Sequence, residues 1–354
     1  MAKLNLTPER LKALDPKDML GKTLELPKQI VAGMKLGRAF AHEHSLTRPE
    51  SVEWFGLGGS AIAGDVLQAM GYKPPATPMH MSIERYLHRV DSGTPCLICS
   101  YSGDTIEAVK AFEGVTASQI WMTMSSGGKI EALSHQAKVP HLKLPAGYPP
   151  RAALGFMLGA MIAVFEESLK CMVWEMPIAL LEDDAQIYRA LNPDENPALS
   201  LAVRLVDRTP VIYTVDSETM PAIAARFRTQ LAENAKVWSH MAMLPEMAHN
   251  EVEAFPFLGQ VLPTPLVILL GGWFHGIGLM DPRPALCSLM DTHSITHVTI
   301  NPEETWNPGV ERVEAVLRTL LFLDTVSVYL AILRAQDPFQ IPVITKLKKA
   351  TTLT

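Results

Sequence analysis

Two apolar, strand-like runs near the start of the chain each end in a glycine- and hydroxyl-rich turn that leads into a helix-forming segment. The first turn, 56–61, reads GLGGSA after the run 51–55, and the second, 100–105, reads SYSGDT after the run 95–99. A helix that begins directly after a strand presents free backbone N–H groups and a partial positive charge, and hydroxyls add donors. Two such turns on neighbouring strands predict a binding site for the phosphate group of a small molecule.

The first turn also has a loose form of the glycine pattern of dinucleotide-binding proteins, with Gly56, Gly58 and Ala61 at the required spacing. The acid that holds a ribose about 20 residues further on is missing, because the first candidate after Asp65 is Glu84. Neither a dinucleotide nor a purely structural turn accounts for the hydroxyls of the second turn. The sequence therefore favours phosphate binding over these two alternatives.

The composition limits the class of protein. With 354 residues, 48% of them hydrophobic and 19% charged, the chain is long enough for two domains with sizeable cores. The net charge of −6 argues against nucleic acid as the main partner, because binding DNA or RNA needs a basic face. The most apolar stretch, 261–273, is short, and two glycines, Gly271 and Gly272, follow its strand-like part. We therefore expect a buried strand and no membrane span.

Four cysteines, Cys96, Cys99, Cys171 and Cys287, form no disulfide framework, which is typical of a reducing cytoplasm. Cys96 and Cys99 have C-x-x-C spacing, but on a strand their sulfurs face opposite sides, which is unsuited to a shared metal ion. We therefore expect core cysteines, no metal site and a soluble, cytoplasmic protein.

Strand and helix signals alternate along both halves, which predicts an α/β protein with two doubly wound lobes, each a mainly parallel sheet flanked by helices. The predicted domains are 1–172 and 173–354. The predicted strands are 52–57, 80–83, 95–100, 119–124, 141–144, 210–214, 237–240, 261–270 and 297–300. The predicted helices are 61–70, 105–113, 129–136, 151–170, 221–232, 246–254 and 309–335.

The residues able to perform acid–base chemistry are Glu233 at a helix end, His249, and Arg151 at a helix start. Proton transfer next to a sugar carbonyl needs a carboxylate base, a cation for the oxyanion and a further acid–base pair to open the ring. Each residue also has a structural alternative: an ordinary helix-end carboxylate, a buried hydrogen-bonded histidine and a helix-starting cation. The C-terminal Lys348 by itself is typical of a solvated tail.

Five motifs in the same order resemble the bifunctional phosphoglucose/phosphomannose isomerase family, part of the sugar isomerase (SIS) superfamily. They are GLGGSAIAGD at 56–65, SYSGDT at 100–105, PRAA at 150–153, ENAK at 233–236 and LPEMAHNE at 244–251. The endings around Asp324 and from Asp337 to Lys348 are also similar to the family's. The resemblance extends nearly from end to end of the chain.

The resemblance implies an aldose–ketose isomerase that interconverts glucose 6-phosphate, and mannose 6-phosphate as well, with fructose 6-phosphate, in carbohydrate metabolism and without metal or cofactor. Glu233 would move the proton between C1 and C2, Arg151 would stabilise the cis-enediolate, and His249 and Lys348 would open the ring. His249 would come from the neighbouring subunit of a homodimer. The implied phosphate contacts are Gly59, Ser60, Ser100, Ser102 and Thr105.

Three positions differ from the family pattern. Asp104 replaces an Asn in the phosphate turn, Ala248 replaces a common Asn, and Phe339 stands in the tail, where it could alter which C2 epimer fits. Two alternative functions stay open: a non-catalytic sugar-phosphate sensor, and an isomerase of another sugar phosphate. A sensor has no use for the four catalytic candidates together, and the chain has no basic helix-turn-helix.

Overall fold

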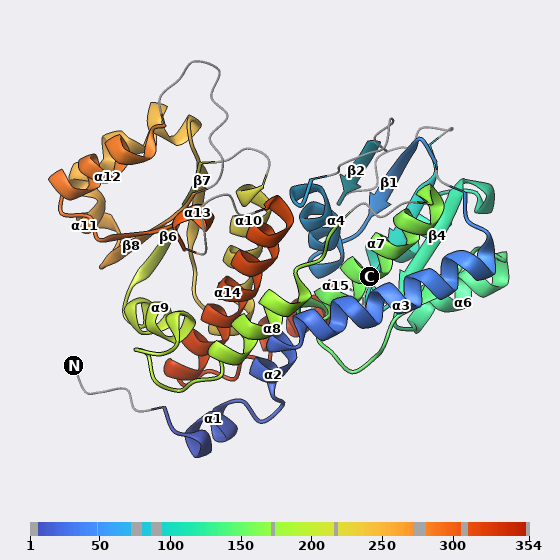
Figure 1. Cartoon of the computed structure of the whole chain (residues 1–354), viewed down its shortest axis with the longest axis horizontal. Helices are drawn as coiled ribbons and strands as arrows, with labels where there is room; N and C mark the ends of the chain where they lie inside the picture. Colours follow the sequence, from blue (N-terminus) through green and yellow to red (C-terminus); the bar gives the residue numbers. More distant parts are fainter. Residues whose placement is uncertain are drawn as a thin grey trace. The chain divides into compact units, whose positions relative to one another are not determined.

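The computed structural model describes residues 6–47, 49–71, 80–85, 94–170, 174–215, 219–271, 281–305 and 311–351. It consists of two compact units (Figure 1). We call residues 25–182 with 312–314 the N-terminal unit, and residues 1–24, 183–311 and 315–354 the C-terminal unit. The first 24 residues thus group with the second half of the chain. The domain boundary after residue 172 stays a prediction.

The N-terminal unit is built on a five-stranded parallel sheet with the strand order β2-β1-β3-β4-β5. Its strands are β1 (Ser51–Phe55), β2 (His80–Glu84), β3 (Cys96–Cys99), β4 (Ile120–Ser125) and β5 (His141–Lys143). All five lie where the sequence predicted strands. The chain passes from β1 outward to β2 and then back to β3 on the other side of β1. The point between β1 and β3 is therefore the topological switch point of the sheet, where α/β proteins bind their ligands.

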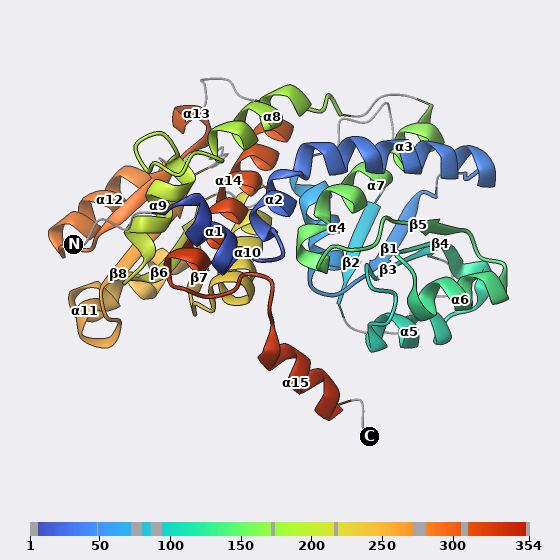
Figure 2. The ribbon, with the colours of Figure 1, turned by 90° about the horizontal axis from the view of Figure 1, so that it is seen from below.

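Helices cover both faces of this sheet, with α5 (Ile106–Glu113) and α6 (Gly128–Ala137) on one side (Figure 2). The other side carries α3 (Leu26–His44), α4 (Gly59–Ala69) and α7 (Leu154–Leu169). Cys96 packs in the α5–α6 core, whereas the Cys99 thiol lies 3.7 Å from Met157 Sδ on α7. The two sulfurs face opposite sides of the sheet, as predicted. Burial raises the pKa of both thiols to about 12, which keeps them in the unreactive thiol form.

Helices α3 and α7 approach each other closely through glycines, which we call the α3–α7 glycine seam (Gly33, Gly37, Gly155 and Gly159). A Cβ at Gly33 would lie 2.4 Å from Phe156 O, and one at Gly37 would lie 2.2 Å from Ala160 O. A Cβ at Gly159 would lie 2.1 Å from Ile30 O. Side chains at these positions would overlap the facing backbone, so the seam fixes how the two helices align along their length.

The predicted helix from residue 151 begins later than expected. Residues Pro150–Ala152 form a separate 3-10 turn, η2, and α7 starts at Leu154. The buried Gln29 amide lies at the junction: its Nε2 donates to Ala152 O (2.9 Å) and its Oε1 accepts from Gly155 N (3.2 Å). A side chain on α3 thus satisfies backbone groups that a continuous helix would have paired itself.

We expect the stability of the N-terminal unit to fall in mild acid because of His141 on β5. Burial lowers the pKa of this imidazole from 6.5 to about 4, and nearby His135 and Lys143 act in the same direction against Glu131. An unfolded chain takes up this proton at a higher pH than the folded one, so the free energy of unfolding decreases as pH falls from about 7 toward 4. Because the ring is only partly buried, we expect a loss of about 1 kcal/mol by pH 5.

Urea unfolding at pH 7 and pH 5 measures this loss. The His141→Gln variant removes the titrating group while leaving a side chain able to hydrogen-bond Thr123, which lies 2.8 Å from His141 Nδ1. The variant should therefore lose less stability than the wild type between the two pH values. An equal loss in both proteins would show that other groups cause the pH dependence.

The C-terminal unit has a four-stranded parallel sheet with the order β7-β6-β8-β9. Its strands are β6 (Thr209–Thr214), β7 (His240–Met243), β8 (Pro265–Leu270) and β9 (His297–Ile300). The strands predicted at 210–214 and 297–300 are confirmed. The strand predicted at 237–240 begins three residues later, as β7 at His240, because Val237 N donates to Leu231 O (3.1 Å) and so closes the preceding helix. The predicted strand 261–270 begins only at Pro265, since 258–261 form the short helix α11 (Leu258–Val261).

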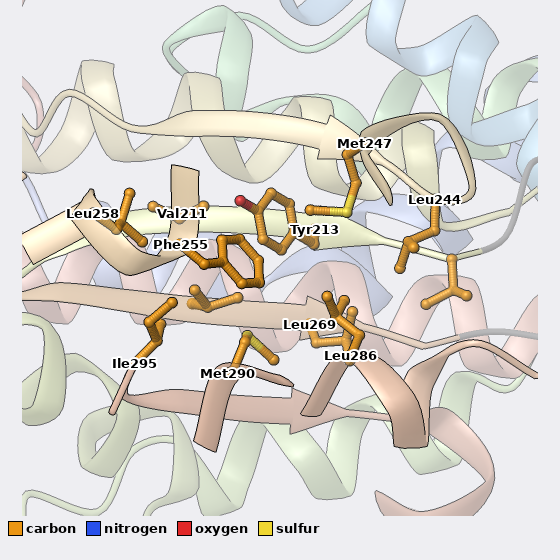
Figure 3. Packing of buried hydrophobic residues seen from close by; sticks show 12 residues of the cluster. Val211, Tyr213, Leu244, Met247, Phe255, Leu258, Leu269, Leu286, Met290 and Ile295 are labelled. Atoms are coloured by element: carbon orange, nitrogen blue, oxygen red, sulfur yellow. The ribbon is translucent and has the colours of Figure 1, made fainter. Parts of the chain in front are cut away.

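One face of this sheet is covered by α12 (Arg283–Thr292), α11 and two 3-10 turns, η4 (Glu246–His249) and η5 (Glu251–Phe257). Figure 3 shows the core between them, in which Tyr213 of β6 packs among Met247, Phe255 and Leu269. The helix predicted at 246–254 is therefore two turns. Asn250 separates them in a non-helical conformation, and its Oδ1 accepts from Glu251 N (2.6 Å). An Asn side chain that bonds the adjacent backbone competes with helix formation.

The remaining helices include α10 (Met220–Gln230) and α14 (Arg312–Leu333), each within two residues of its prediction apart from 309–310, which lie outside the described residues. Helix α14 is long and apolar enough to cross a membrane, but 94% of its most apolar window is buried, as in the core helix of a globular domain. The other helices are α1 (Pro8–Leu14), α2 (Met19–Leu24), α8 (Ile178–Ile187), α9 (Pro197–Leu205), α13 (Pro302–Thr305), α15 (Pro342–Thr351) and η1 (Ala117–Gln119).

Candidate active site

The first predicted phosphate turn forms the N-terminus of α4, directly after β1. Gly58 has φ 53° and ψ −126°, a conformation that only glycine adopts readily, and it places the Gly59 N–H at the start of the helix. The Ser60 N–H donates to Leu57 O (3.1 Å) within the turn. The buried Ser60 Oγ accepts from Tyr101 N at 3.1 Å, so it links the first turn to the second. Since β1 and β3 are paired neighbours, the two turns lie side by side at the switch point of the sheet.

The second turn is closed by hydrogen bonds between its own residues. Ser100 Oγ donates to Thr105 Oγ1 (3.0 Å), and Ser102 Oγ accepts from Asp104 N (3.3 Å). Gly103, at φ 73°, leaves no room for a side chain, because a Cβ there would lie 1.7 Å from Gly127 O. The turn therefore has one arrangement, with Thr105 in the N-cap position of α5.

Asp104 directs its carboxylate to the start of the neighbouring helix α6. Its Oδ1 accepts from Lys129 N at 3.0 Å, within the first turn of that helix. A helix N-terminus carries partial positive charge and stabilises a carboxylate. Asp104, which stands where the family pattern has Asn, belongs to the same turn as Ser102. Its negative charge is stabilised by the N-terminus of α6.

Arg151 lies in the 3-10 turn η2 and is only 4% exposed. This turn packs against the first phosphate turn, because a Cβ at Gly59 would lie 2.9 Å from Pro150 O and 3.4 Å from Arg151 N. The N-terminal unit therefore brings together both predicted phosphate turns and the backbone of the predicted oxyanion-binding residue. The end of η2 is fixed by Gln29, which donates to Ala152 O.

Glu233 lies in a five-residue π-helical turn, Leu231–Ala235, that continues α10, and its side chain is partly buried. Single π turns widen a helix locally and occur frequently at functional sites. The next residue, the buried Asn234, donates from Nδ2 to Ser327 Oγ (2.9 Å) on α14. Two turns earlier, Arg226 forms a buried ion pair with Asp324 on α14, with a closest distance of 2.6 Å. The turn that carries Glu233 is thus attached to α14 by Asn234, and the helix before it by Arg226.

His249 is the last residue of the turn η4 and is exposed, so the alternative of a buried, satisfied histidine was wrong. The residues after it are held by Glu251, whose carboxylate receives the Tyr213 hydroxyl (3.2 Å) and lies 2.9 Å from His240 Nε2. Burial and the adjacent carboxylate raise the pKa of Tyr213, which keeps it a donor. Glu251 thereby fixes the backbone two residues after His249.

Lys348 is exposed on α15, which extends away from the sheet of its own unit in Figure 2. The same helix exposes Val343 by 79% and Leu347 by 64%. The C-terminal unit therefore carries Glu233, His249 and Lys348, whereas the predicted phosphate contacts and Arg151 belong to the N-terminal unit. Among the described residues, no group of three or more His, Cys, Asp or Glu side chains is placed to hold a metal ion.

Several residues with a clear structural part in the candidate site were not assigned one from the sequence: Gln29, Tyr101, Asn234 and Lys236. Asn234 and Lys236 stand in the ENAK motif beside Glu233, so their proximity was a signal. Gln29 lies more than 120 residues from the turn it supports, and no local pattern relates the two. The π turn has no sequence signature, since a continuous α-helix fits the same residues.

Comparisons with known proteins agree with this architecture. A hypothetical protein from Thermus thermophilus superimposes with a TM-score of 0.70 at 15% identity, covering 98% of this chain and 94% of the other. The C-terminal domain of glucosamine-fructose-6-phosphate aminotransferase from Francisella tularensis gives a TM-score of 0.62 at 15% identity, covering 91% of this chain and 98% of the other. Both likenesses show the α/β fold, with parallel sheets flanked by helices.

Residues 194–350 match the family model of the bacterial phospho-glucose isomerase C-terminal SIS domain. The match lies in the second half of the chain. A bifunctional phosphoglucose/phosphomannose isomerase from Caldicellulosiruptor bescii is 27% identical over 342 residues, which is 93% of this chain and 98% of the relative. One from Aeropyrum pernix is 23% identical, covering 89% of this chain and 92% of the relative. The resemblance found in the motifs is thereby confirmed.

Proposed function

We propose that the protein is an aldose–ketose isomerase that interconverts glucose 6-phosphate and mannose 6-phosphate with fructose 6-phosphate. The observation that carries the proposal is a pair of linked strand–turn–helix phosphate turns at the switch point of one sheet, the first of which packs against the Arg151 turn. The relatives named bifunctional phosphoglucose/phosphomannose isomerase, one of which matches over 93% of this chain, support the choice of reaction.

In the proposed mechanism, the phosphate of the substrate is bound at the start of α4 by the Gly59 N–H and by Ser60, and by Ser100, Ser102 and Thr105 of the second turn. Helix N-termini favour a dianion through their free donors and partial charge. Binding at these turns orients the sugar chain, so that the phosphate supplies binding energy for positioning the carbons that react.

Glu233 acts as the base in this proposal. Its carboxylate takes the proton from C2 of the open-chain aldose, and the electron pair forms the C1–C2 double bond while the carbonyl oxygen becomes an oxyanion. The Arg151 guanidinium stabilises the cis-enediolate. The protonated Glu233 then returns the proton to C1 while the hydroxyl proton on O2 passes to O1, so the ketone forms at C2 and no net charge, proton or electron is lost. His249 and Lys348 act earlier, by moving protons to and from the ring oxygen and the anomeric hydroxyl.

The proposal includes a homodimer in which His249 is supplied to the active site of the neighbouring subunit, and a cytoplasmic location. The exposure of His249 at the end of η4 is compatible with a role outside its own unit. Gel filtration coupled to light scattering measures the oligomeric state. A monomer that is fully active would contradict the shared site.

The second candidate function is a reaction on another sugar phosphate. It is supported by a D-glucosamine-6-phosphate 4-epimerase from Sulfolobus acidocaldarius, which is 28% identical over 58% of this chain. A coupled assay of the purified protein with EDTA distinguishes the two, using glucose 6-phosphate, mannose 6-phosphate and glucosamine 6-phosphate in parallel. We expect fructose 6-phosphate to form from the first two. Turnover of glucosamine 6-phosphate alone would favour the epimerase chemistry, and binding without turnover of any would favour a sensor.

Replacing Asp104 by Asn should improve substrate binding. The amide oxygen can still accept from Lys129 N, so the start of α6 stays capped while the negative charge beside the phosphate turn is removed. We expect KM for glucose 6-phosphate to fall about threefold with little change in kcat, since one exposed charge contributes less than about 1 kcal/mol. The effect should shrink in high salt. A higher KM would mean that the carboxylate has a further task in the turn.

A further inference from the structure

Lys236 comes directly after the π turn that carries Glu233 and ends it in a left-handed conformation, with φ 56°. A lysine is an unusual residue for this conformation, which glycine or asparagine normally occupies at a helix end. Its backbone N–H donates to Leu231 O and closes the turn.

The Lys236 ammonium donates to three backbone carbonyls. Two belong to the π turn itself, Glu233 O and Asn234 O, each at 3.0 Å. The third is Asp337 O at 2.6 Å, in the segment between the end of α14 at Leu333 and the start of α15 at Pro342. The three bonds come from one flexible side chain and converge on one charged group, and hydrogen bonds to charged groups are among the stronger ones in proteins.

These contacts have a direct effect on the backbone of Glu233. The last carbonyl groups of a helix accept no hydrogen bond from an N–H of the same helix, and this end carries partial negative charge. A cation there is therefore favourable. By bonding the carbonyl of Glu233, the ammonium restricts rotation of the peptide unit to which the Glu233 side chain is attached. The next residue, Asn234, is restricted by its own bond to Ser327 on α14.

The bond from the Lys236 ammonium to Asp337 O connects the Glu233 turn to the segment that leads into α15, the helix that carries Lys348. Asp337 lies shortly before α15 begins at Pro342, and its Oδ1 also accepts from Phe339 N (2.7 Å), which orders the segment. The ring of Phe339 in turn lies 4.5 Å from the Lys17 ammonium. The base of α15 is therefore attached to the C-terminal unit at the turn of Glu233.

We propose that Lys236 is a positioning residue, which fixes the Glu233 turn for proton transfer and attaches the base of the Lys348 helix to that turn. The inference rests on the proposed isomerase function for its kinetic part. Its structural part concerns the π turn itself and is measurable whatever the protein catalyses.

The test compares Lys236→Met with Lys138→Met. Lys138 is a matched control, because it ends α6 in the same left-handed conformation with φ 56° and belongs to the other unit. We expect Lys236→Met to lower kcat about 20-fold with KM changed less than about twofold, since small misplacement of a reacting group costs rate rather than binding. Lys138→Met should retain wild-type kcat. Lys236→Arg, which keeps a donor cation, should recover kcat to within about threefold of wild type.

Equal kcat in the two methionine variants would overturn the inference, and so would a raised KM with unchanged kcat. The attachment of α15 is tested by combining Lys236→Met with Lys348→Met. The combined loss of kcat should be smaller than the product of the single losses, because part of what Lys236 positions is then already absent. Losses that multiply fully would disprove the connection to α15.

Hydrogen exchange separates failure of this inference from failure of the proposed function. The amides of 231–237 should exchange at least about tenfold faster in Lys236→Met than in the wild type, while those of α6 should not change. Unchanged exchange would refute the positioning role even in an active enzyme. Faster exchange in a protein that turns over no sugar phosphate would leave the structural role supported and the isomerase proposal rejected.

Discussion

Replacing Glu233 by Gln is expected to reduce kcat for glucose 6-phosphate isomerisation by about 1,000-fold, with KM changed less than about threefold, because loss of a positioned general base typically costs about 10²–10⁴ in rate. The amide has the same shape as the carboxylate but cannot take the C2 proton. The phosphate turns belong to the other compact unit and keep their own hydrogen bonds, so binding should persist. Coupled kinetics and calorimetric titration with a non-reacting sugar phosphate measure the two quantities.

The control is Glu253→Gln, which makes the same change at an exposed carboxylate in η5. It should leave kcat within about twofold of wild type. A Glu233→Gln protein that loses binding together with turnover would show that the residue holds substrate rather than moving its proton. A protein that keeps full activity would remove Glu233 from the mechanism.

Replacing Arg226 by Met is expected to have the largest effect on stability. The guanidinium Nε donates to both carboxylate oxygens of Asp324 at 3.0 Å, and both side chains are almost fully buried between α10 and α14. Removing one partner leaves the other charge buried and unpaired, which costs about 3–5 kcal/mol. Gln230 also bonds Asp324, but it cannot neutralise the charge. Denaturant unfolding at pH 7 measures the loss.

Two further variants make the interpretation specific. Arg226→Met combined with Asp324→Leu should recover much of the lost stability, since replacing both members of a buried pair by apolar groups is often nearly neutral. Lys143→Met breaks the exposed pair of Lys143 and Glu131 (2.8 Å) and should cost less than about 1 kcal/mol. A double variant as unstable as the single one would point to lost packing rather than to an unpaired charge.

Much of the fold could be predicted because its signals are local. The strands before the two phosphate turns were predicted from apolar runs, and each phosphate turn lies at a strand end. The failures occur where a distant or unusual contact decides the structure. Val237 lies outside the strand predicted for it because its N–H donates to Leu231 O. Asn250 interrupts a predicted helix because its side chain accepts from the N–H of Glu251. Neither competition is visible in apolar periodicity.

The candidate site shows the same division. The glycines and hydroxyls of the two turns were selected because the chemistry of phosphate binding demands them within a few residues of a helix start. Gln29, by contrast, acts on Ala152 and Gly155 across more than 120 residues of sequence. The π turn at Glu233 and the three bonds of Lys236 depend on where α14 ends and on the path of the chain from there to α15. Such relations exist only in the folded chain.

The α3–α7 glycine seam makes part of the protein sensitive to changes far from any ligand. Gly37 lies two turns along α3 from Gln29, which supports the Arg151 turn, and it has no room for even one methyl group against Ala160 O. Alanine there would force the two helices to separate or slide, and the turn at the start of α7 would move with them. In a random-mutagenesis screen for lost activity, small substitutions along this seam should therefore appear beside those in the phosphate turns. They would be recognised by normal folding and a displaced, rather than absent, site.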